Sequence, residues 1–322
     1  MNDIYHHSVQ RLVGSCQLNE KGQQLHYVIH GPIQNQNKIM LIMGLTTDGA
    51  NWLHTVDHFT SKGFSVLTFD NLGNGRSSTP TSMFELSIYS MGQDALKLLD
   101  FIQWEASQTH LVGVSMGGMI SLEMLARRRF RSGTLIVTTG VSALWFPMGG
   151  IWHMVRTLLD PTLTTYERSM LAMEQNFDRD WLDRDSDFVH PRTGQVMTNE
   201  KSLTRVGAKI WYGKQNDGIP PDPTTTGMLA QMLACVRHHV SQKKLNRIRT
   251  KNGPLLIIGA KNDKMVRTNG SRELADQLEP SEFFIVDSSH GLIRQYYDQV
   301  HAGMERLFEK SQIVVVVDRS RL

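Results

Sequence analysis

The pentapeptide Gly-Val-Ser-Met-Gly at residues 113–117 places a serine where a nucleophile could work. A strand-like apolar run over residues 110–114 leads directly into Ser115, and a helical pattern over residues 117–126 follows it. So tight a turn needs close backbone contacts, which the two flanking glycines allow. The turn raises the serine hydroxyl above the sheet edge and aims the N–H of Met116 into the same space, where it can hold an oxyanion. The pattern predicts a nucleophile for acyl transfer.

A serine hydroxyl is a weak nucleophile at neutral pH, so it needs a general base and a carboxylate that orients the base. Two loops that follow consecutive predicted strands supply these groups. Asp263 follows the strand predicted over residues 255–258, and His290 follows the strand predicted over residues 283–286. Asp287 also follows a strand, which makes it a rival for the role of the acid.

The order serine, acid, histidine resembles that of the α/β-hydrolase superfamily, and the resemblance covers nearly the whole chain. It implies that Ser115 attacks a carbonyl, that His290 takes the serine proton, and that Asp263 orients the imidazole. Asp287 is then expected to shape the histidine loop. Similar epoxide hydrolases and dehalogenases place an aspartate at the elbow, so the serine argues against both.

The loop after the strand predicted over residues 39–43 resembles the family's second source of an oxyanion donor. Met43 stands where the family often has a histidine, but the donor is a backbone N–H and survives this change. The resemblance assigns the donor to Leu45, the residue after Gly44, and implies that Trp52 packs under the loop.

Residues 69–77 resemble the family's Asp-x-Arg-Gly-x-Gly-x-Ser turn, with Leu72 in place of the usual arginine. A dinucleotide site is not indicated, because no third glycine follows at the required spacing, and no phosphate-loop motif occurs. The histidine pairs at residues 6–7 and 238–239 lack partners at metal-ligand spacing and are expected on the surface. The sequence therefore predicts neither a cofactor nor a metal ion.

Short apolar runs alternate with amphipathic helical patterns, which is typical of a mainly parallel sheet covered by helices. We therefore expect an α/β fold, with a mostly parallel central sheet flanked by helices and an inserted helical cap. The predicted strands cover residues 12–18 and 25–30, which are antiparallel, and then residues 39–43, 65–69, 110–114, 134–139, 255–258 and 283–286. The predicted helices of the core cover residues 90–102, 117–126, 271–278 and 292–308.

The alternation breaks between residues 141 and 250, which we interpret as a cap inserted into a core of residues 1–140 and 251–310. The cap shows helical windows at residues 151–159, 166–176 and 228–245 without convincing strands, and a tail at residues 311–322 follows the core. The methionines and aromatic residues of the cap form either its own core or an adaptable apolar pocket. The residues predicted to line such a pocket are Gly44, Trp145, Met148 and Trp152.

The composition predicts a soluble intracellular protein. A net charge of +3 over 322 residues gives no electrostatic case for nucleic acid or an anionic membrane. The longest apolar run, residues 313–317, is far too short to cross a bilayer, and no secretory signal is visible. Two cysteines, Cys16 and Cys235, cannot form a disulfide framework and favour a reducing compartment.

The chain ends in Ser320, Arg321 and Leu322, a sequence similar to the Ser-Lys-Leu address of peroxisomal proteins. It predicts recognition by a peroxisomal import receptor. The alternative is a cytoplasmic enzyme with an accidental ending. Residues 313–317, just before these three, are expected to form an added edge strand or a linker that presents the tail.

Together these patterns predict a serine hydrolase that cleaves a carboxylic ester or thioester of a medium-sized apolar acyl group. Carbon–carbon bond hydrolases and cofactor-free haloperoxidases of similar fold carry the same three residues and stay open as alternatives. A receptor of this fold that binds its ligand without turnover is a further alternative.

Overall fold

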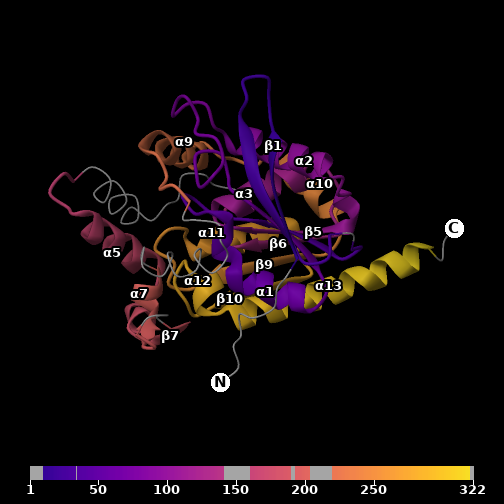
Figure 1. Cartoon of the computed structure of the whole chain (residues 1–322). Coiled ribbons are helices and arrows are strands. Elements are labelled where there is room, and N and C mark those ends of the chain that lie inside the picture. Colours follow the sequence, from indigo (N-terminus) through magenta and orange to yellow (C-terminus); the bar gives the residue numbers. More distant parts are fainter. Residues whose placement is uncertain (1–9, 34, 141–159, 190–192, 204–219, 320–322) are drawn as a thin grey trace.

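The computed structural model of the protein describes residues 10–33, 35–140, 160–189, 193–203 and 220–319 (Figure 1). Its centre is a mostly parallel sheet of eight strands in the order β1-β2-β4-β3-β5-β6-β9-β10. Only the pairs β1–β2 and β2–β4 are antiparallel. The strands are β1 (Arg11–Gln17), β2 (Gln24–His30), β3 (Lys38–Ile42), β4 (Ser65–Phe69), β5 (Thr109–Val114), β6 (Ser132–Ile136), β9 (Leu255–Ala260) and β10 (Glu282–Val286). The predicted fold class is confirmed.

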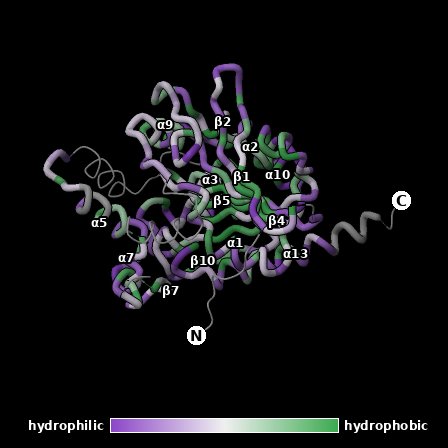
Figure 2. The backbone as a smooth tube through the Cα atoms, viewed as in Figure 1, coloured by the Kyte–Doolittle hydropathy of each residue, from purple (hydrophilic) through white to green (hydrophobic). Residues whose placement is uncertain are grey.

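Helices cover both faces of the sheet, so the central strands bury both of their faces. In β3, Met40 and Ile42 join one apolar cluster, whereas Ile39 and Leu41 join the other. This arrangement explains why the parallel strands are unbroken aliphatic runs in the sequence. The first cluster includes α2 (Ile88–Phe101), α3 (Met116–Leu125), α10 (Gln242–Lys251) and α11 (Thr268–Leu278), and the second includes α1 (Leu53–Ser61) and α13 (Tyr297–Arg319). Figure 2 shows the hydrophobic strands at the centre, surrounded by hydrophilic loops.

The predicted helix over residues 292–308 is two helices, α12 (Leu292–Gln295) and α13 (Tyr297–Arg319), interrupted at Tyr296. Because α13 continues through residues 313–317, the expectation of an edge strand or a linker there was wrong. Isoleucine and valine favour strands, but the preference is weak, and a helix that has already formed extends at little cost. Within the described ranges, no helix is both long and apolar enough to span a membrane.

The region of residues 141–250 contains an antiparallel pair, β7 (Asp185–Val189) and β8 (Val196–Thr198), so the expectation of no strands was wrong. These strands are only five and three residues long, and neither contains the run of aliphatic residues on which strand prediction depends. Among its described residues, the helices are α5 (Thr165–Asn176), α6 (Arg179–Leu182), α7 (Asn199–Leu203), α9 (Thr225–Val236) and α10. The predicted window at residues 228–245 therefore spans parts of two helices, and the window at residues 151–159 lies outside the described residues. Two short 3₁₀ helices also occur: η1 (Gly49–Trp52) precedes α1, and η2 (Ala106–Gln108) precedes β5.

A buried histidine lies where α1 packs against α13. The imidazole of His301 stacks on that of His58 with ring centroids 4.3 Å apart, and its Nε2 lies 3.1 Å from Thr55 Oγ1. Burial, reinforced by His58, lowers the pKa of His301 to about 3. His301 is therefore neutral in the folded protein at pH 7.

This histidine makes the fold sensitive to acid. The unfolded chain binds a proton at His301 below a pH of about 6.5, whereas the folded chain does not, so stability is lost as the pH falls from about 6.5 toward 3. We predict that His301→Phe, which keeps a stacking ring, reduces the loss of unfolding free energy between about pH 7 and pH 5 by about 2 kcal/mol. Urea unfolding at the two pH values measures it. His239→Phe, at an exposed position, is the control, and an unchanged pH dependence in His301→Phe would contradict the assignment.

Candidate active site

Ser115 lies on the turn between β5 and α3 in a strained backbone conformation. Its φ of 55° and ψ of −120° are unusual for a residue with a side chain. The turn is held from β6 and its following loop, because Ser115 N donates to Ile136 O at 2.9 Å and Thr138 Oγ1 donates to Ser115 O at 2.9 Å. Such strain persists only where neighbouring contacts enforce it, and it is concentrated at functional sites.

The glycines that flank Ser115 allow backbones to touch. A Cβ at Gly117 would lie 2.1 Å from Ile42 O, and a Cβ at Gly113 would lie 2.3 Å from Gly117 O. Neither position has room for a side chain. The first turn of α3 therefore lies directly against the end of β3, as a nucleophile elbow requires.

Asp263 and His290, from the loops after β9 and β10, are in contact. His290 Nδ1 lies 2.7 Å from Asp263 Oδ2, while the other carboxylate oxygen accepts from the N–H groups of Met265 at 2.7 Å and Val266 at 2.8 Å. The Asp263 side chain is 1% exposed and that of His290 is 11% exposed. Because a carboxylate only accepts, Nδ1 carries the hydrogen and Nε2 is left to receive a proton.

The rival acid, Asp287, lies in solvent. Its side chain is 68% exposed, and its two oxygens accept from Lys261 Nζ and Asn262 Nδ2, each at 2.9 Å. The bond to Lys261 is the main cause that holds the pKa of Asp287 below its ordinary value. Its described contacts include none with His290, so of the two acids it is Asp263 that contacts the histidine.

The three predicted catalytic residues lie at one edge of the sheet, after the carboxyl ends of β5, β9 and β10. The described contacts do not include a hydrogen bond between Ser115 Oγ and His290 Nε2. Hydrogen bonds of this kind are often long in unliganded enzymes and tighten when substrate binds. The structure thus brings two of the three residues into contact and places the third on the same edge.

The predicted oxyanion donors flank Ser115. Gly44 adjoins the serine, since a Cβ there would lie 3.3 Å from Ser115 Cβ, and the half-buried Leu45 follows it. Met116 begins α3, where the first N–H groups have no partner within the helix. In the part of the chain that the structure describes, neither the N–H of Leu45 nor that of Met116 donates a hydrogen bond. Both are free to bind an anionic oxygen.

The turn after β4 is hydrogen-bonded to the segment that follows the loop of Leu45. Asp70 accepts from the N–H groups of Gly49 at 2.8 Å and Arg76 at 2.9 Å. Leu72, at the position of the family's arginine, is buried in the first apolar cluster. Trp52 is buried with Met43 in the second cluster, consistent with packing under the loop.

Sequence reasoning missed a buried amide that reaches the site from α9. The Gln231 side chain accepts from the N–H of Thr46, next to Leu45, at 2.9 Å. It also donates to Leu72 O at 2.8 Å. A glutamine within a helical pattern gives no local sign that it will be buried, so the sequence could not identify it.

Sequence reasoning also missed the segment after α5 that holds the loop of His290. Asp178 accepts from Ser289 Oγ at 2.5 Å and from Gln295 Nε2 at 2.9 Å. The N–H of Gly291 donates to Asn176 O at 2.6 Å. These bonds fix the loop on both sides of the histidine. Asp178 is more than 100 residues away from Ser289 and Gln295 in the sequence. No sequence motif contains these residues together, so the contact could not be predicted.

Of the residues predicted to line an apolar pocket, the structure describes only Gly44, which lies beside Ser115. Trp145, Met148 and Trp152 lie outside the described residues, as do Ser320, Arg321 and Leu322.

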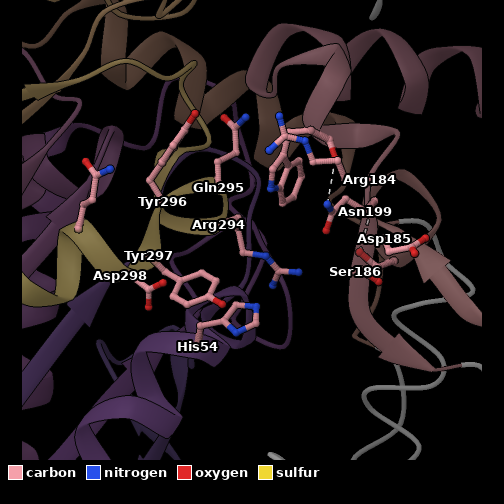
Figure 3. Close-up of a pocket in the computed structure, with 13 residues that line it drawn as sticks. His54, Arg184, Asp185, Ser186, Asn199, Arg294, Gln295, Tyr296, Tyr297 and Asp298 are labelled. Carbon is pink, nitrogen blue, oxygen red and sulfur yellow. Dashed lines mark hydrogen bonds between the residues drawn. The ribbon is translucent and has the colours of Figure 1, made fainter. Parts of the chain in front are cut away.

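A separate polar cavity of about 320 Å³ lies between α1 and α12 on one side and the β7–α7 segment on the other. Figure 3 shows His54 and Tyr297 together on one wall and Arg184, Ser186 and Asn199 on the other. Burial, and then the nearby Arg294, lowers the pKa of His54 to about 3. The predicted catalytic residues do not line this cavity.

One of the two histidine pairs departs from expectation. His239 is exposed as predicted, but His238 is buried, and burial lowers its pKa to about 4. The two histidines follow the end of α9, and one side chain is buried while the other is exposed. The sequence pattern did not predict this difference. The pair at residues 6–7 lies outside the described residues. Among the residues that the structure places, no three His, Cys, Asp or Glu side chains gather as metal ligands would.

This fold and these loops define a class of protein. The chain matches the family model of the alpha/beta hydrolase fold over residues 37–293, and it belongs to that family of hydrolases.

Particular relatives are more distant. The protein named 3-oxoadipate enol-lactonase 1 of Acinetobacter baylyi is 28% identical over 127 residues, or 39% of this chain and 45% of that protein. A relative from Agrobacterium fabrum that carries the name carbamate hydrolase RutD is 24% identical over 269 residues, or 82% of this chain and 89% of that protein. The chain spans less than half the length of the first curated relatives that it matches.

Among solved structures, the 2-hydroxy-6-oxo-6-phenylhexa-2,4-dienoate hydrolase of Rhodococcus sp. strain RHA1 resembles the chain with a TM-score of 0.69. It is 18% identical and covers 94% of this chain and 100% of its own. A likeness at this identity concerns the fold alone.

Replacing Asp263 and replacing Asp287 should have different effects on turnover. We expect Asp263→Asn to lower the turnover of an activated ester by about 10⁴-fold, because the imidazole loses the carboxylate that fixes its tautomer. Asp287→Asn is the matched control and should stay within about twofold of the wild type, since its exposed carboxylate is bonded to Lys261 and Asn262. Steady-state kinetics on both variants measures this, and a larger loss in Asp287→Asn would reverse the assignment.

Proposed function

We propose that the protein is a serine hydrolase that cleaves a carboxylic ester or thioester with a medium-sized apolar acyl group. The proposal is carried by one juxtaposition: Ser115 on its strained turn and the buried Asp263–His290 pair share one edge of the sheet. Family membership supports hydrolysis in general. The nature of the bond that is cleaved belongs to the proposal.

Each residue has a defined task in this reaction. Ser115 Oγ attacks the carbonyl carbon while His290 Nε2 takes its proton, and Asp263 stabilises the imidazolium that results. The N–H groups of Leu45 and Met116 hold the oxyanion. His290 then gives its proton to the leaving alcohol or thiol. In the second half, it activates a water molecule that releases the acyl group from Ser115.

The substrate class is supported by the sequence of the predicted cap and by one relative. Methionines and aromatic residues of region 141–250, including Trp145, Met148 and Trp152, suit an apolar acyl chain. The relative named enol-lactonase points to lactones as one form of ester to test. Esters of medium-sized apolar acyl groups are the first candidates.

The test is a series of p-nitrophenyl esters and acyl-CoA thioesters, from acetyl to dodecanoyl, measured beside Ser115→Ala. We expect turnover to fall about 10⁴- to 10⁶-fold in Ser115→Ala. It should stay unchanged in Ser61→Ala, at an exposed serine of α1.

Equal turnover in wild type and Ser115→Ala would contradict the proposal. Binding without turnover, and without rapid fluorophosphonate labelling of Ser115, would indicate a receptor. Cleavage confined to carbon–carbon bonds of diketone substrates, or halogenation of a substrate that requires both a halide ion and hydrogen peroxide, would indicate the other chemistries of this triad.

We also propose that Ser320, Arg321 and Leu322 direct the protein to a peroxisomal import receptor. The sequence of this ending supports the proposal. So does the course of α13, which carries the chain away from the body of the molecule before these residues (Figure 1).

The address can be tested in a cell that has peroxisomes, with a fluorescent protein fused to the N-terminus of the full chain. We expect punctate fluorescence that coincides with a peroxisomal marker and that becomes diffuse when residues 320–322 are deleted. Arg321→Lys, which restores the usual address, is the control. Diffuse fluorescence of the wild-type fusion together with punctate Arg321→Lys would show that this ending is not an address.

A further inference from the structure

We propose that Gln231 is a positioning residue for catalysis, which holds the loop of the oxyanion donor Leu45 by bonding to Thr46. This inference rests on the proposed function. Gln231 is fully buried in α9, where its Oε1 accepts from Thr46 N at 2.9 Å and its Nε2 donates to Leu72 O at 2.8 Å. The bridge joins the loop after β3 to the turn after β4.

The chemistry of the bridge requires an amide. Thr46 offers an N–H, which needs an acceptor, and Leu72 offers a carbonyl, which needs a donor. A glutamine amide supplies an acceptor and a donor together. The two partners therefore fix the orientation of the amide, with Oε1 toward Thr46 and Nε2 toward Leu72. An ionised carboxylate would supply only the acceptor, and a methionine of similar length would supply neither. An unpaired N–H and an unpaired carbonyl would then remain beside the site.

Thr46 needs this support because its backbone is strained. Its φ of 54° lies in the left-handed region, which β-branched residues rarely adopt. Its N–H belongs to the peptide that directly follows Leu45. The bond to Gln231 therefore fixes a peptide plane next to the predicted oxyanion donor. Without that bond, the loop is free to relax toward an unstrained conformation and carry Leu45 with it.

The helix that carries Gln231 is itself firmly placed. One turn earlier, Gly227 touches the turn after β4, since a Cβ at Gly227 would lie 2.3 Å from Gly73 O. Ala230 and Ala234 are buried in the first apolar cluster. The helix is capped by Thr224, whose Oγ1 accepts from Gly227 N at 3.0 Å. Gln231 thus projects from a rigid element, as a positioning residue must.

The test compares kcat and KM for p-nitrophenyl butyrate in the wild type and in Gln231→Met. We expect kcat to fall about 10- to 100-fold with KM nearly unchanged, because the loss affects the transition state. The inhibitor 1,1,1-trifluoropentan-2-one forms an oxyanion on a nucleophilic serine. Its inhibition constant should rise by a similar factor. A purely structural role would lower the melting temperature without this selective loss.

Two further variants separate the explanations. Thr224→Ala weakens the same helix at its cap but keeps both bonds of Gln231, so its kcat should stay within about twofold of the wild type. Adding Thr46→Gly to Gln231→Met should recover several-fold in kcat, because glycine adopts a positive φ without strain. This rescue is not expected if Gln231 only fills space.

If Gln231→Met does not fold, Gln231→Leu also removes the acceptor for Thr46 N and should still lower kcat more than twofold. A folded Gln231 variant with wild-type kcat, or a loss no larger than that of Thr224→Ala, would overturn the inference. An absence of Ser115-dependent turnover in the wild type would instead contradict the proposed function itself.

Discussion

The candidate site depends on a backbone contact between the first turn of α3 and the end of β3. A Cβ at Gly117 would meet Ile42 O at 2.1 Å and Met43 O at 2.8 Å, so no side chain can separate the two elements. Since β3 and β5 are neighbours in the sheet, this contact brings the turn of Ser115 beside the loop of Leu45. The spacing between Ser115 and the predicted oxyanion donors is therefore set by the backbone rather than by side-chain rotamers. Fixed dipoles of this kind need no reorganisation when charge develops.

Region 141–250 supports the site from two sides. Gln231 bonds to the loop of the predicted oxyanion donor Leu45, and Asp178 bonds to the loop of His290 through Ser289. The loop of Asp263 is tied to the same region, because Lys264 Nζ donates to Glu174 O at 3.1 Å. A region that only covered the substrate would not need these bonds to the core loops. We infer that this region also holds the loops that carry the predicted catalytic residues.

The sequence predicted the elements that local patterns determine. The central strands are unbroken aliphatic runs because they are buried on both faces, and the elbow is recognisable because its glycines are sterically required. Gln231 and Asp178 were missed because each forms its hydrogen bonds with segments that are distant in the sequence. The pair β7 and β8 was missed because its strands are short and lack an aliphatic run. The helix over residues 313–317 was missed because its valines suggest a strand.

Three of the five described non-glycine residues with a positive φ lie at the edge of the sheet that holds the predicted catalytic residues. Thr46 after β3, Ser115 after β5 and Val137 after β6 all have positive φ values, of 54°, 55° and 42°. Each such residue costs on the order of 1–3 kcal/mol, so the surrounding contacts must hold all three in place. For Thr46 that contact is the Gln231 amide, and for Ser115 it is the bonds to Ile136 and Thr138. For Val137 it is the bond from its N–H to Ile258 O, at 2.8 Å. The other two described residues of this kind, Gln103 and Glu279, lie just after the helices α2 and α11. We attribute the strain at the three neighbouring strand ends to the demands of a reaction.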